Sequence, residues 1–408
     1  MKICLVVAND MTHDSRVDRH ADTLGANGHD VTVLCVQTLR TKREETKAHY
    51  SIIRRKDLLR RLIEARMHIR ATQDSTAYRA AEEATNVSLP KTMIRKFFRC
   101  ALAVMFDATM SLEAKRLNAD LYICNDLDTL PVGVFMSLLG KIVVYDAHEL
   151  YPDLFGETQP YIRAIMRQME SFMIRFADLV MTVNEFIASE LSSRYRIPAP
   201  TVVINCPKSP PEIPVTWRER KEKVVLYHGG LTRERGLENT VLACKHLRKG
   251  IRVVIRGEGP IERELKELAR GLDNCHFEEP VPMDEVITKA ADADIGVIPY
   301  LPTTLNNLYT SPNKLFEYLQ AGLPVVGSDV PFIRKTLLEN DVGFVFNPYD
   351  PEDIAQTIEL VAQDDVLERM RANVRMIRHK FSWNVESRKL LAAILNLAAK
   401  RDVVTDGK

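Results

Sequence analysis

Short apolar runs alternate with segments of helical periodicity along this chain, and this alternation restricts the fold more than any other feature. An apolar run at 3–8 precedes a helix-periodic segment at 15–27, and another apolar run follows at 31–36. Such alternation is typical of parallel sheets that helices cover on both faces. The first set of predicted strands continues at 121–124, 142–145 and 179–183. We therefore predict an α/β fold of doubly wound sheets.

The alternation stops and then restarts, which indicates two domains. Residues 201–222 are polar and contain four prolines, as is typical of a linker. We assign residues 1–200 to a first domain and residues 223–382 to a second. The second set of predicted strands lies at 224–227, 253–255, 276–277, 295–299, 325–326 and 344–346. In such sheets ligands bind outside the carboxyl ends of the strands, so we expect a ligand cleft there.

The stretch SPNKLFEYLQAGLPVVGSD at 311–329 contains the most informative predicted helix. Ser311 suits the N-cap and Pro312 the first helical position. Lys314 lies in the first turn, where the helix dipole disfavours a cation unless an anion is bound there. Glu317 follows one turn later, where its carboxylate could accept hydrogen bonds from a diol such as ribose. The alternative is a solvated Lys314–Glu317 pair at i, i+3 spacing.

Glycine-rich turns follow two predicted strands of the second domain. VLYHGGLTRERG at 225–236 reads as a strand, a glycine loop and the start of a helix, with Arg235 beside that start. A glycine loop that faces a helix N-terminus can bind an anion, although a simple turn would also explain the two glycines. The turn at Arg256-Gly257 lets the backbone approach a flat ring closely.

These segments together resemble glycosyltransferase family 4, the retaining transferases of GT-B fold. The resemblance extends over most of the chain and also includes HDSRV at 13–17 and DAHELYPD at 146–153. It implies two Rossmann-like domains with a cleft between them, and a C-terminal helix at 383–408 that returns to the first domain. It further implies sugar transfer from a nucleoside diphosphate sugar, with UDP the expected nucleotide, to a hydroxyl of a glycan or lipid-linked acceptor. No metal or other cofactor is expected.

The resemblance also assigns site residues by position. The catalytic residues would be His148, Arg235 and Lys314. Donor binding would fall to Gly229, Gly230, Arg256, Gly257, Ser311, Asn313 and Glu317. On the acceptor side it implies His13, Asp14, Arg16 and Glu149, while the residues alone favour a helix cap and a surface arginine at 14–16.

The chain departs from the family pattern at several positions, among them Arg235, where the family usually has lysine. The family signature has two glutamates, and Glu317 matches the second, while Tyr309 stands where the first would be. A tyrosine cannot act as that carboxylate, so the identity of the sugar stays open, and Asn313 and Lys314 are expected to take over donor contacts. Gly230 stands where the family usually has arginine.

A possible metal motif, Asp126-Leu127-Asp128, follows a predicted buried strand. We interpret one of these aspartates as a helix cap rather than a metal ligand. The seven cysteines are scattered, without metal-ligand spacing, and we expect buried free thiols in a reducing compartment.

Charge and hydropathy bear on the partners. The net charge of +1 argues against general nucleic-acid binding. Between Arg40 and Arg99 the chain has 16 Lys/Arg and 7 Asp/Glu, and residues 91–104 mix cations with large apolar residues. Such a stretch suits an anionic membrane surface, although a docked surface helix has the same pattern. We expect a cytoplasmic protein that associates peripherally with the inner face of the membrane.

Two other functions are compatible with the sequence. One is a GT-B nucleotide-sugar epimerase, which would act without an acceptor. The other is an inactive sugar-nucleotide-binding partner of a transferase, which Tyr309 and Gly230 motivate.

Overall fold

The structure is a computed structural model that describes residues 1–38, 41–56, 108–155, 159–210 and 222–406. The chain divides into two compact units. Unit 1 comprises Met1–His148, Arg167–Met181 and Ile394–Lys408, and unit 2 comprises Glu149–Met166 and Thr182–Ala393. The domain limits given above remain a prediction, and residues 211–221 of the expected linker lie outside the described residues.

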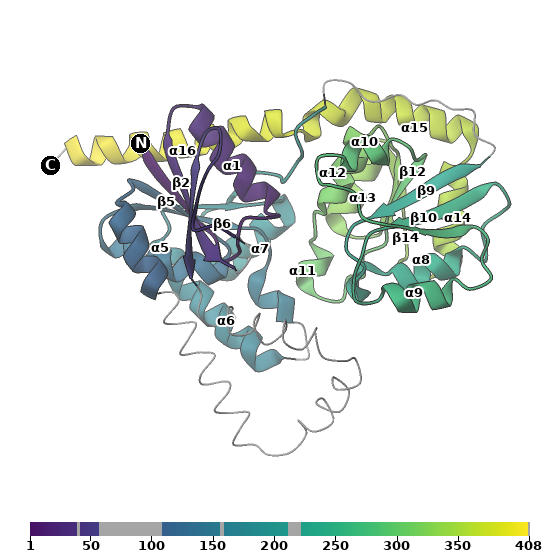
Figure 1. The fold of residues 1–408 in the computed structure, drawn as a ribbon, viewed down its shortest axis with the longest axis horizontal. Coiled ribbons are helices and arrows are strands. Elements are labelled where there is room, and N and C mark those ends of the chain that lie inside the picture. The colour runs from purple at the N-terminus through teal and green to yellow at the C-terminus, as the bar shows by residue number, and fades with distance from the viewer. Residues whose placement is uncertain (39–40, 57–107, 156–158, 211–221, 407–408) are drawn as a thin grey trace, which may run out of the picture. The chain divides into compact units, whose positions relative to one another are not determined.

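In the described part of the chain up to residue 210, eight strands form one sheet in the order β3-β4-β2-β1-β5-β6-β7-β8. Figure 1 labels β2, β5 and β6 of this sheet. β1 pairs in parallel with β2 on one side and β5 on the other, so the strand order reverses at β1. The antiparallel pair β3–β4 was not predicted. The strands are β1 (Lys2–Val6), β2 (Asp30–Gln37), β3 (Glu44–Thr46), β4 (Ser51–Lys56), β5 (Leu121–Asn125), β6 (Ile142–Ala147), β7 (Leu179–Thr182) and β8 (Thr201–Val202).

From residue 222 onward, the described strands form a six-stranded sheet in the order β11-β10-β9-β12-β13-β14. Every pair in this sheet is parallel, as predicted. β9 has β10 on one side and β12 on the other, so the carboxyl edge at β9 is where ligands bind in such sheets. The strands are β9 (Lys223–His228), β10 (Ile251–Arg256), β11 (Cys275–Glu278), β12 (Ile295–Ile298), β13 (Val325–Ser328) and β14 (Gly343–Phe346).

Helices connect the strands, and polar side chains cap several of them. Asp14 caps α1 by accepting from the backbone N–H of Val17, and Asp350 caps α14 in the same way. The α-helices are α1 (Ser15–Ala26), α5 (Leu130–Leu138), α6 (Pro160–Met173), α7 (Glu185–Tyr195), α8 (Leu237–Ala243), α9 (Glu262–Leu268), α10 (Val286–Ala290), α11 (Leu305–Leu308), α12 (Asn313–Gln320), α13 (Pro331–Glu339), α14 (Pro351–Val361), α15 (Asp364–Ile377) and α16 (Trp383–Asp406). Short 3₁₀ turns are η1 (Leu127–Thr129), η2 (Tyr151–Phe155), η3 (Ile174–Phe176), η4 (Arg233–Arg235) and η5 (Arg378–Phe381).

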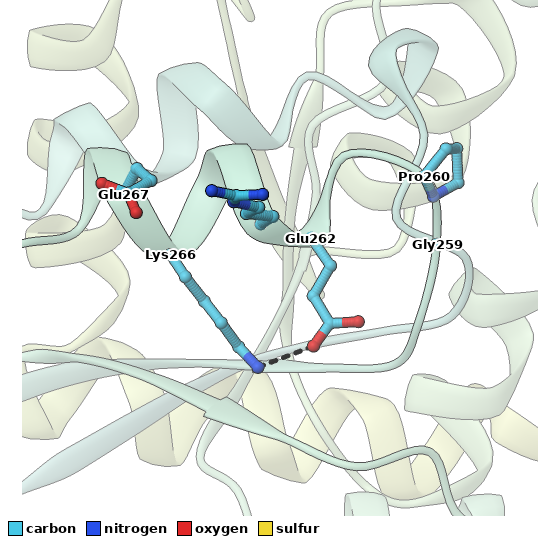
Figure 2. Close-up of a pocket in the computed structure, with 6 residues that line it drawn as sticks. Gly259, Pro260, Glu262, Lys266 and Glu267 are labelled. Atoms are coloured by element: carbon cyan, nitrogen blue, oxygen red, sulfur yellow. Dashed lines mark hydrogen bonds and ion pairs between the residues drawn. The ribbon is translucent and has the colours of Figure 1, made fainter. Parts of the chain in front are cut away.

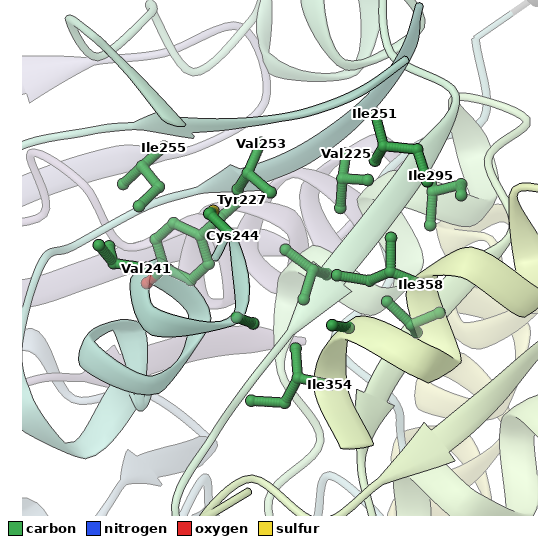
Figure 3. Close-up of a cluster of buried hydrophobic side chains, with 14 of the residues drawn as sticks. Val225, Tyr227, Val241, Cys244, Ile251, Val253, Ile255, Ile295, Ile354 and Ile358 are labelled. Carbon is green, nitrogen blue, oxygen red and sulfur yellow. The ribbon is translucent and has the colours of Figure 1, made fainter. Parts of the chain in front are cut away.

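Apolar side chains cover both faces of the second sheet, as a doubly wound fold requires. One cluster joins the strands to α8, α14 and α15, and includes Val225, Val253 and Ile358 (Figure 3). A second cluster on the opposite face joins them to α10, α12 and α13. The site-bearing helix α12 is therefore anchored by its buried side, which includes Leu315, Phe316 and Leu319 as predicted.

Two predictions about helix ends have different outcomes. The N-cap of α12 is Pro312, which has an extended backbone, and no side chain caps the helix, so the predicted cap at Ser311 is wrong. The returning C-terminal helix is confirmed, because the part of α16 from Ile394 onward belongs to unit 1.

Two further observations bear on compartment and membrane. Six cysteines are free and buried, as predicted: Cys4, Cys35, Cys124, Cys206, Cys244 and Cys275. Among the described residues no helix combines the length and the apolar content that crossing a bilayer requires. The basic stretch at 91–104 lies outside the described residues.

Candidate functional site

Lys314 occupies an unusual position at the start of α12 in unit 2. Its side chain is buried, with 7% exposed, and Nζ donates a hydrogen bond to the Tyr300 hydroxyl at 2.8 Å. Nζ also lies 4.5 Å from the ring centre of Tyr227 and 4.6 Å from that of Tyr300. Burial opposes the ammonium form, but Tyr300 and Tyr227 outweigh it and raise the pKa of Lys314. The alternative of a solvated Lys314–Glu317 pair is therefore wrong.

Arg235 converges on the same aromatic ring. Its guanidinium carbon lies 4.1 Å from the ring centre of Tyr300, a cation–π contact. Neither Arg235 nor Lys314 forms an ion pair with a carboxylate of the described residues. Two cations thus meet at Tyr300 without a negative partner. We call Lys314, Arg235, Tyr300 and Tyr227 the cation cluster.

The glycine loops lie beside the cation cluster and pack on each other. Gly229 has a φ of 120°, and a Cβ added there would lie 3.4 Å from Nζ of Lys314. A Cβ on Gly257 would lie 2.0 Å from the carbonyl oxygen of Gly229, so only glycine allows this approach. The backbone N–H of Gly229 donates to the carbonyl of Arg256 at 3.0 Å. The two loops therefore form one surface at the carboxyl edge of β9 and β10.

Glu317 lies one turn after Lys314 but pairs with a residue of β9. Its Oε2 lies 2.6 Å from Nε2 of His228, and the carboxylate stays a quarter exposed. His228 is buried beneath it, its ring 4.6 Å from that of Tyr318. Nδ1 of His228 has no hydrogen-bond partner among the described residues. His228 thus holds the Glu317 carboxylate, which remains partly exposed to solvent.

The other predicted donor residues have different surroundings. Arg256 pairs with Glu278 at 2.8 Å, and Asn313 accepts a hydrogen bond from Asn205 at 2.9 Å, so both side chains already have a partner within the chain. Gly230 has open space where a side chain would stand, and its carbonyl accepts from the Tyr227 hydroxyl at 2.7 Å. Ser311 precedes α12 without capping it.

Tyr309, in the position of the family's first glutamate, has a packing role. Its ring stacks on Phe186 with ring centres 6.1 Å apart, and its carbonyl accepts from the Asn184 amide at 2.8 Å. The stacking explains how a large aromatic residue is accommodated at the position where the family has its first glutamate.

In unit 1, a buried ion pair lies at the carboxyl end of β6. Arg16 donates from Nε and Nη2 to the two carboxylate oxygens of Asp146, at 2.9 and 2.6 Å. Arg16 is 2% exposed and Asp146 is fully buried, so the expectation of a surface arginine is wrong. Burial favours the neutral acid, but Arg16 and then His148 hold the pKa of Asp146 well below its usual range.

His148 lies between two carboxylates at this edge. Nδ1 is 3.2 Å from Oδ2 of Asp126, and Nε2 is 3.3 Å from Oδ2 of Asp146. The backbone N–H of His148 also donates to Asp126 at 2.9 Å. Burial disfavours the imidazolium, but the carboxylates of Asp126 and then Asp146 outweigh it and raise the pKa of His148 to about 9. His148 is thus a cation at neutral pH.

Asp126 therefore has a different role from the one predicted. It precedes η1 without making a side-chain cap, so the cap interpretation is wrong for this residue, and its carboxylate holds His148 instead. His20 is buried 3.5 Å from Asp146, and burial, followed by the charge of Arg16, lowers its pKa well below the ordinary range. We call Arg16, His20, Asp126, Asp146 and His148 the histidine cluster.

The remaining acceptor-side residues are spread out. Asp14 caps α1 and also accepts from the Asn9 amide at 2.7 Å. His13 is exposed in the preceding loop. Glu149 is exposed and accepts from the Asn306 amide at 3.4 Å within unit 2. Of the four predicted residues, only Arg16 joins the histidine cluster.

A metal-ligand group and a pocket beside α9 are the other features of the described residues that bear on a site. No group of three or more His, Cys, Asp or Glu side chains in the described ranges could hold a metal ion. A pocket beside α9 is lined by Gly259, Pro260, Glu262, Arg263, Lys266 and Glu267 (Figure 2). Its Lys266 and Glu262 pair with each other at 2.6 Å.

Sequence reasoning missed Tyr300, Tyr227, His228 and Asp126. Three of them could have been found from one signal. Tyr227 and His228 end the apolar run of β9, and Tyr300 follows that of β12, which places all three at the carboxyl edge where ligands bind.

Comparisons with known proteins agree for both halves of the chain. Residues 15–207 match the family model described as Glycosyltransferase Family 4, and residues 222–364 match Glycosyl transferases group 1. A sulfoquinovosyl transferase of Arabidopsis thaliana is 26% identical over 176 residues, 42% of this chain and 33% of that protein. An amylovoran biosynthesis glycosyltransferase of Erwinia amylovora is 27% identical over 41% of this chain and 43% of its own length. The matches thus span about a third to just over half of the first curated relatives.

Solved structures share the fold across nearly the whole chain. Sucrose-phosphate synthase of Thermosynechococcus elongatus has a TM-score of 0.72 at 16% identity, covering 98% of this chain and 100% of that one. HepE of Anabaena, in complex with UDP, has a TM-score of 0.68 at 13% identity, covering 97% and 100%. The predicted fold, two α/β units on largely parallel sheets as in GT-B glycosyltransferases, is confirmed.

Proposed function

We propose that this chain, which belongs to the group 1 glycosyl transferases of glycosyltransferase family 4, moves a sugar from a nucleoside diphosphate sugar to an acceptor hydroxyl. The observation that carries the proposal is the cation cluster. Lys314 and Arg235 meet at Tyr300, beside a glycine loop and the start of α12, and have no carboxylate partner among the described residues. A diphosphate supplies the negative charge that this arrangement lacks.

UDP is the nucleotide we propose. HepE, which shares the fold, was solved with UDP. Glu317 supports a nucleoside next to the diphosphate, because its partly exposed carboxylate can accept from both hydroxyls of a ribose. The glycine loops at Gly229 and Gly257 let the nucleotide approach the backbone.

Because the acceptor hydroxyl is the nucleophile, the protein's main task in the transfer is to stabilise the leaving group. The bond from the anomeric carbon to the diphosphate oxygen breaks as the acceptor oxygen bonds to that carbon, and negative charge grows on the departing UDP. Preorganised cations stabilise such charge where it develops. We propose attack from the same face, so that the configuration is retained and the departing phosphate takes the acceptor's proton. We further propose that Lys314 and Arg235 stabilise the departing UDP without a metal ion.

His148 is proposed to assist in unit 1. Held between Asp126 and Asp146, its ring is fixed in orientation and carries a positive charge. Such a fixed ring can contact a sugar. The buried Arg16–Asp146 pair positions it, so Arg16 acts through Asp146 rather than on the acceptor directly.

We propose a glycan or lipid-linked acceptor. One relative is named for amylovoran biosynthesis, and another is a sulfoquinovosyl transferase. A surface observation favours lipid: α6 exposes the large apolar side chains of Tyr161, Ile162, Ile165, Met169 and Phe172. At 100° per residue these five lie within one 100° arc of the helix, so they form a single apolar stripe of the kind that enters a membrane interface.

The test is incubation with a panel of nucleotide sugars, with and without hydroxyl acceptors, followed by chromatography and NMR. We expect release of UDP and a new glycoside that retains the anomeric configuration of the donor. An epimerised nucleotide sugar without acceptor would identify an epimerase instead. Binding without any turnover would identify an inactive partner, as Tyr309 and Gly230 motivate. Binding of no nucleotide sugar would refute the proposal.

A further inference from the structure

Tyr300 touches both cations of the cation cluster, and three segments of the chain meet at its ring. It lies two residues after the end of β12 and is itself buried, with 6% exposed. Its hydroxyl accepts the hydrogen bond of Lys314 from α12, and its ring lies against Arg235 from η4. No other described residue contacts both side chains through a hydrogen bond or a ring contact.

The backbone around Tyr300 is fixed to the loop that carries Arg235. The N–H of Leu301 donates to the carbonyl of Glu234 at 3.0 Å. Gly236 has a φ of 64°, and a Cβ added there would lie 2.0 Å from the carbonyl oxygen of Pro299. These contacts flank Tyr300 and Arg235, so the backbone that carries Arg235 is held beside the backbone that carries Tyr300.

Two cations close to each other repel, and without an anion each would turn toward solvent. The Tyr300 hydroxyl gives the buried ammonium of Lys314 an acceptor, and the negative face of the ring attracts the guanidinium of Arg235. One neutral residue therefore holds both charges at the same edge without neutralising them. A carboxylate in its place would compete with the ligand.

We propose that Tyr300 is a positioning residue that keeps Lys314 and Arg235 ready for the diphosphate of the donor. This inference rests on the proposed function, and it adds a residue that acts through both cations rather than by touching the reacting atoms. Its hydroxyl accepts a hydrogen bond from Lys314 and its ring contacts Arg235, so substitutions can remove the two interactions separately.

The test combines two substitutions of Tyr300 with calorimetric titration of UDP. UDP is the suitable ligand because it carries the charge that the departing group gains. Tyr300→Phe removes only the acceptor for Lys314 and should weaken UDP binding about tenfold, as loss of a hydrogen bond to a charged group does. Tyr300→Gln keeps a hydrogen-bonding side chain but loses the ring below Arg235, and should also weaken UDP binding. Uridine affinity, followed by ligand-observed NMR, should change less than twofold in both variants.

A double-mutant cycle separates positioning from a merely structural role. If Tyr300 acts through Lys314, then Tyr300→Phe should have less than a twofold effect in a Lys314→Met background. Tyr50→Phe is the matched control, because Tyr50 is also buried and its hydroxyl donates to Asp18 in unit 1. The control should bind UDP as the wild type does.

Three results would overturn the inference. They are unchanged UDP affinity in Tyr300→Phe, equal weakening of UDP and uridine, and full additivity with Lys314→Met. If the wild type binds none of UDP, GDP, ADP and dTDP, the proposed function fails and this inference fails with it. If another nucleotide of that panel binds, the cycle is run with it. Thermal unfolding of each variant shows whether a loss of binding comes from a loss of fold.

Discussion

Asp126→Asn should lower the pKa of His148 without changing the backbone. Asparagine has the same size and shape as aspartate, so at the φ of 63° and ψ of 170° of Asp126 it meets the same backbone strain, and the substitution removes only the charge. At the 3.2 Å separation of Nδ1 and Oδ2, the charge–charge attraction amounts to about 5 kcal/mol at an effective dielectric constant of 20. That is enough to outweigh burial, as the raised pKa of His148 requires.

The size of the effect follows from the pKa itself. The difference between the His148 pKa of about 9 in the folded protein and the ordinary imidazole pKa of 6.5 corresponds to about 3 kcal/mol of stability. Because the pKa is raised on folding, this stability is fully present below pH 6.5 and is lost as the pH rises through 9. The wild type should therefore become less stable between pH 6.5 and 9.5, beyond any change shown by His148→Gln. In Asp126→Asn this difference should shrink.

NMR titration of the His148 ring measures the pKa directly, with His148→Gln to assign the signal. Urea unfolding at pH 6 and pH 9.5 measures the stability. His13→Gln is the matched control, because His13 is exposed in a loop of the same unit. A wild-type pKa near 6.5, or one that Asp126→Asn leaves unchanged, would refute the reasoning.

Three further predictions concern the donor, the metal and the membrane. Glu317→Ala should weaken UDP binding at least about tenfold with the fold intact, because charge-assisted hydrogen bonds to the ribose are lost. Unchanged UDP affinity by calorimetry would give Glu317 a structural role beside His228 and no role in donor binding. Turnover should survive excess chelator, and activity that only Mn²⁺ restores would contradict the metal-independent proposal. Wild-type protein should sediment with anionic vesicles at low salt, and replacing Ile165 and Phe172 with Gln should abolish this. Charge reversal at Arg95, Lys96 and Arg99 should do the same if the basic stretch also binds, whereas wild-type protein in the supernatant at low salt would exclude both surfaces.

The elements of the second unit were predictable from periodicity alone. β9, β12 and α12 were expected within a residue or two of their observed limits, because buried strands and amphipathic helices leave a strong local pattern. The first residue of α12 was misplaced because Pro312 is extended, with a ψ of 135°, and the helix begins after it. β3 was missed because three charged or polar residues at a sheet edge show no such pattern.

Side-chain partners were not predictable, because they depend on contacts that are distant in sequence. Arg16 reads as a surface residue until Asp146, 130 positions away, is brought beside it. Lys314 and Glu317 are neighbours on one helix, yet each pairs with a residue from another strand end: Tyr300 for Lys314 and His228 for Glu317. The spacing of charges along α12 indicated a site correctly but could not indicate what holds those charges in place.

The most direct test of the central claim is the rate of UDP release from a saturating donor by the wild type and by Lys314→Met. Methionine keeps the length and apolar packing of the lysine and removes its charge. We expect kcat to fall by about 10²–10³, as loss of one preorganised stabilising group typically produces, in a protein that still folds at the assay temperature. Normal UDP release from a destabilised Lys314→Met protein would contradict the claim, because Lys314 would then serve the fold and not the leaving group.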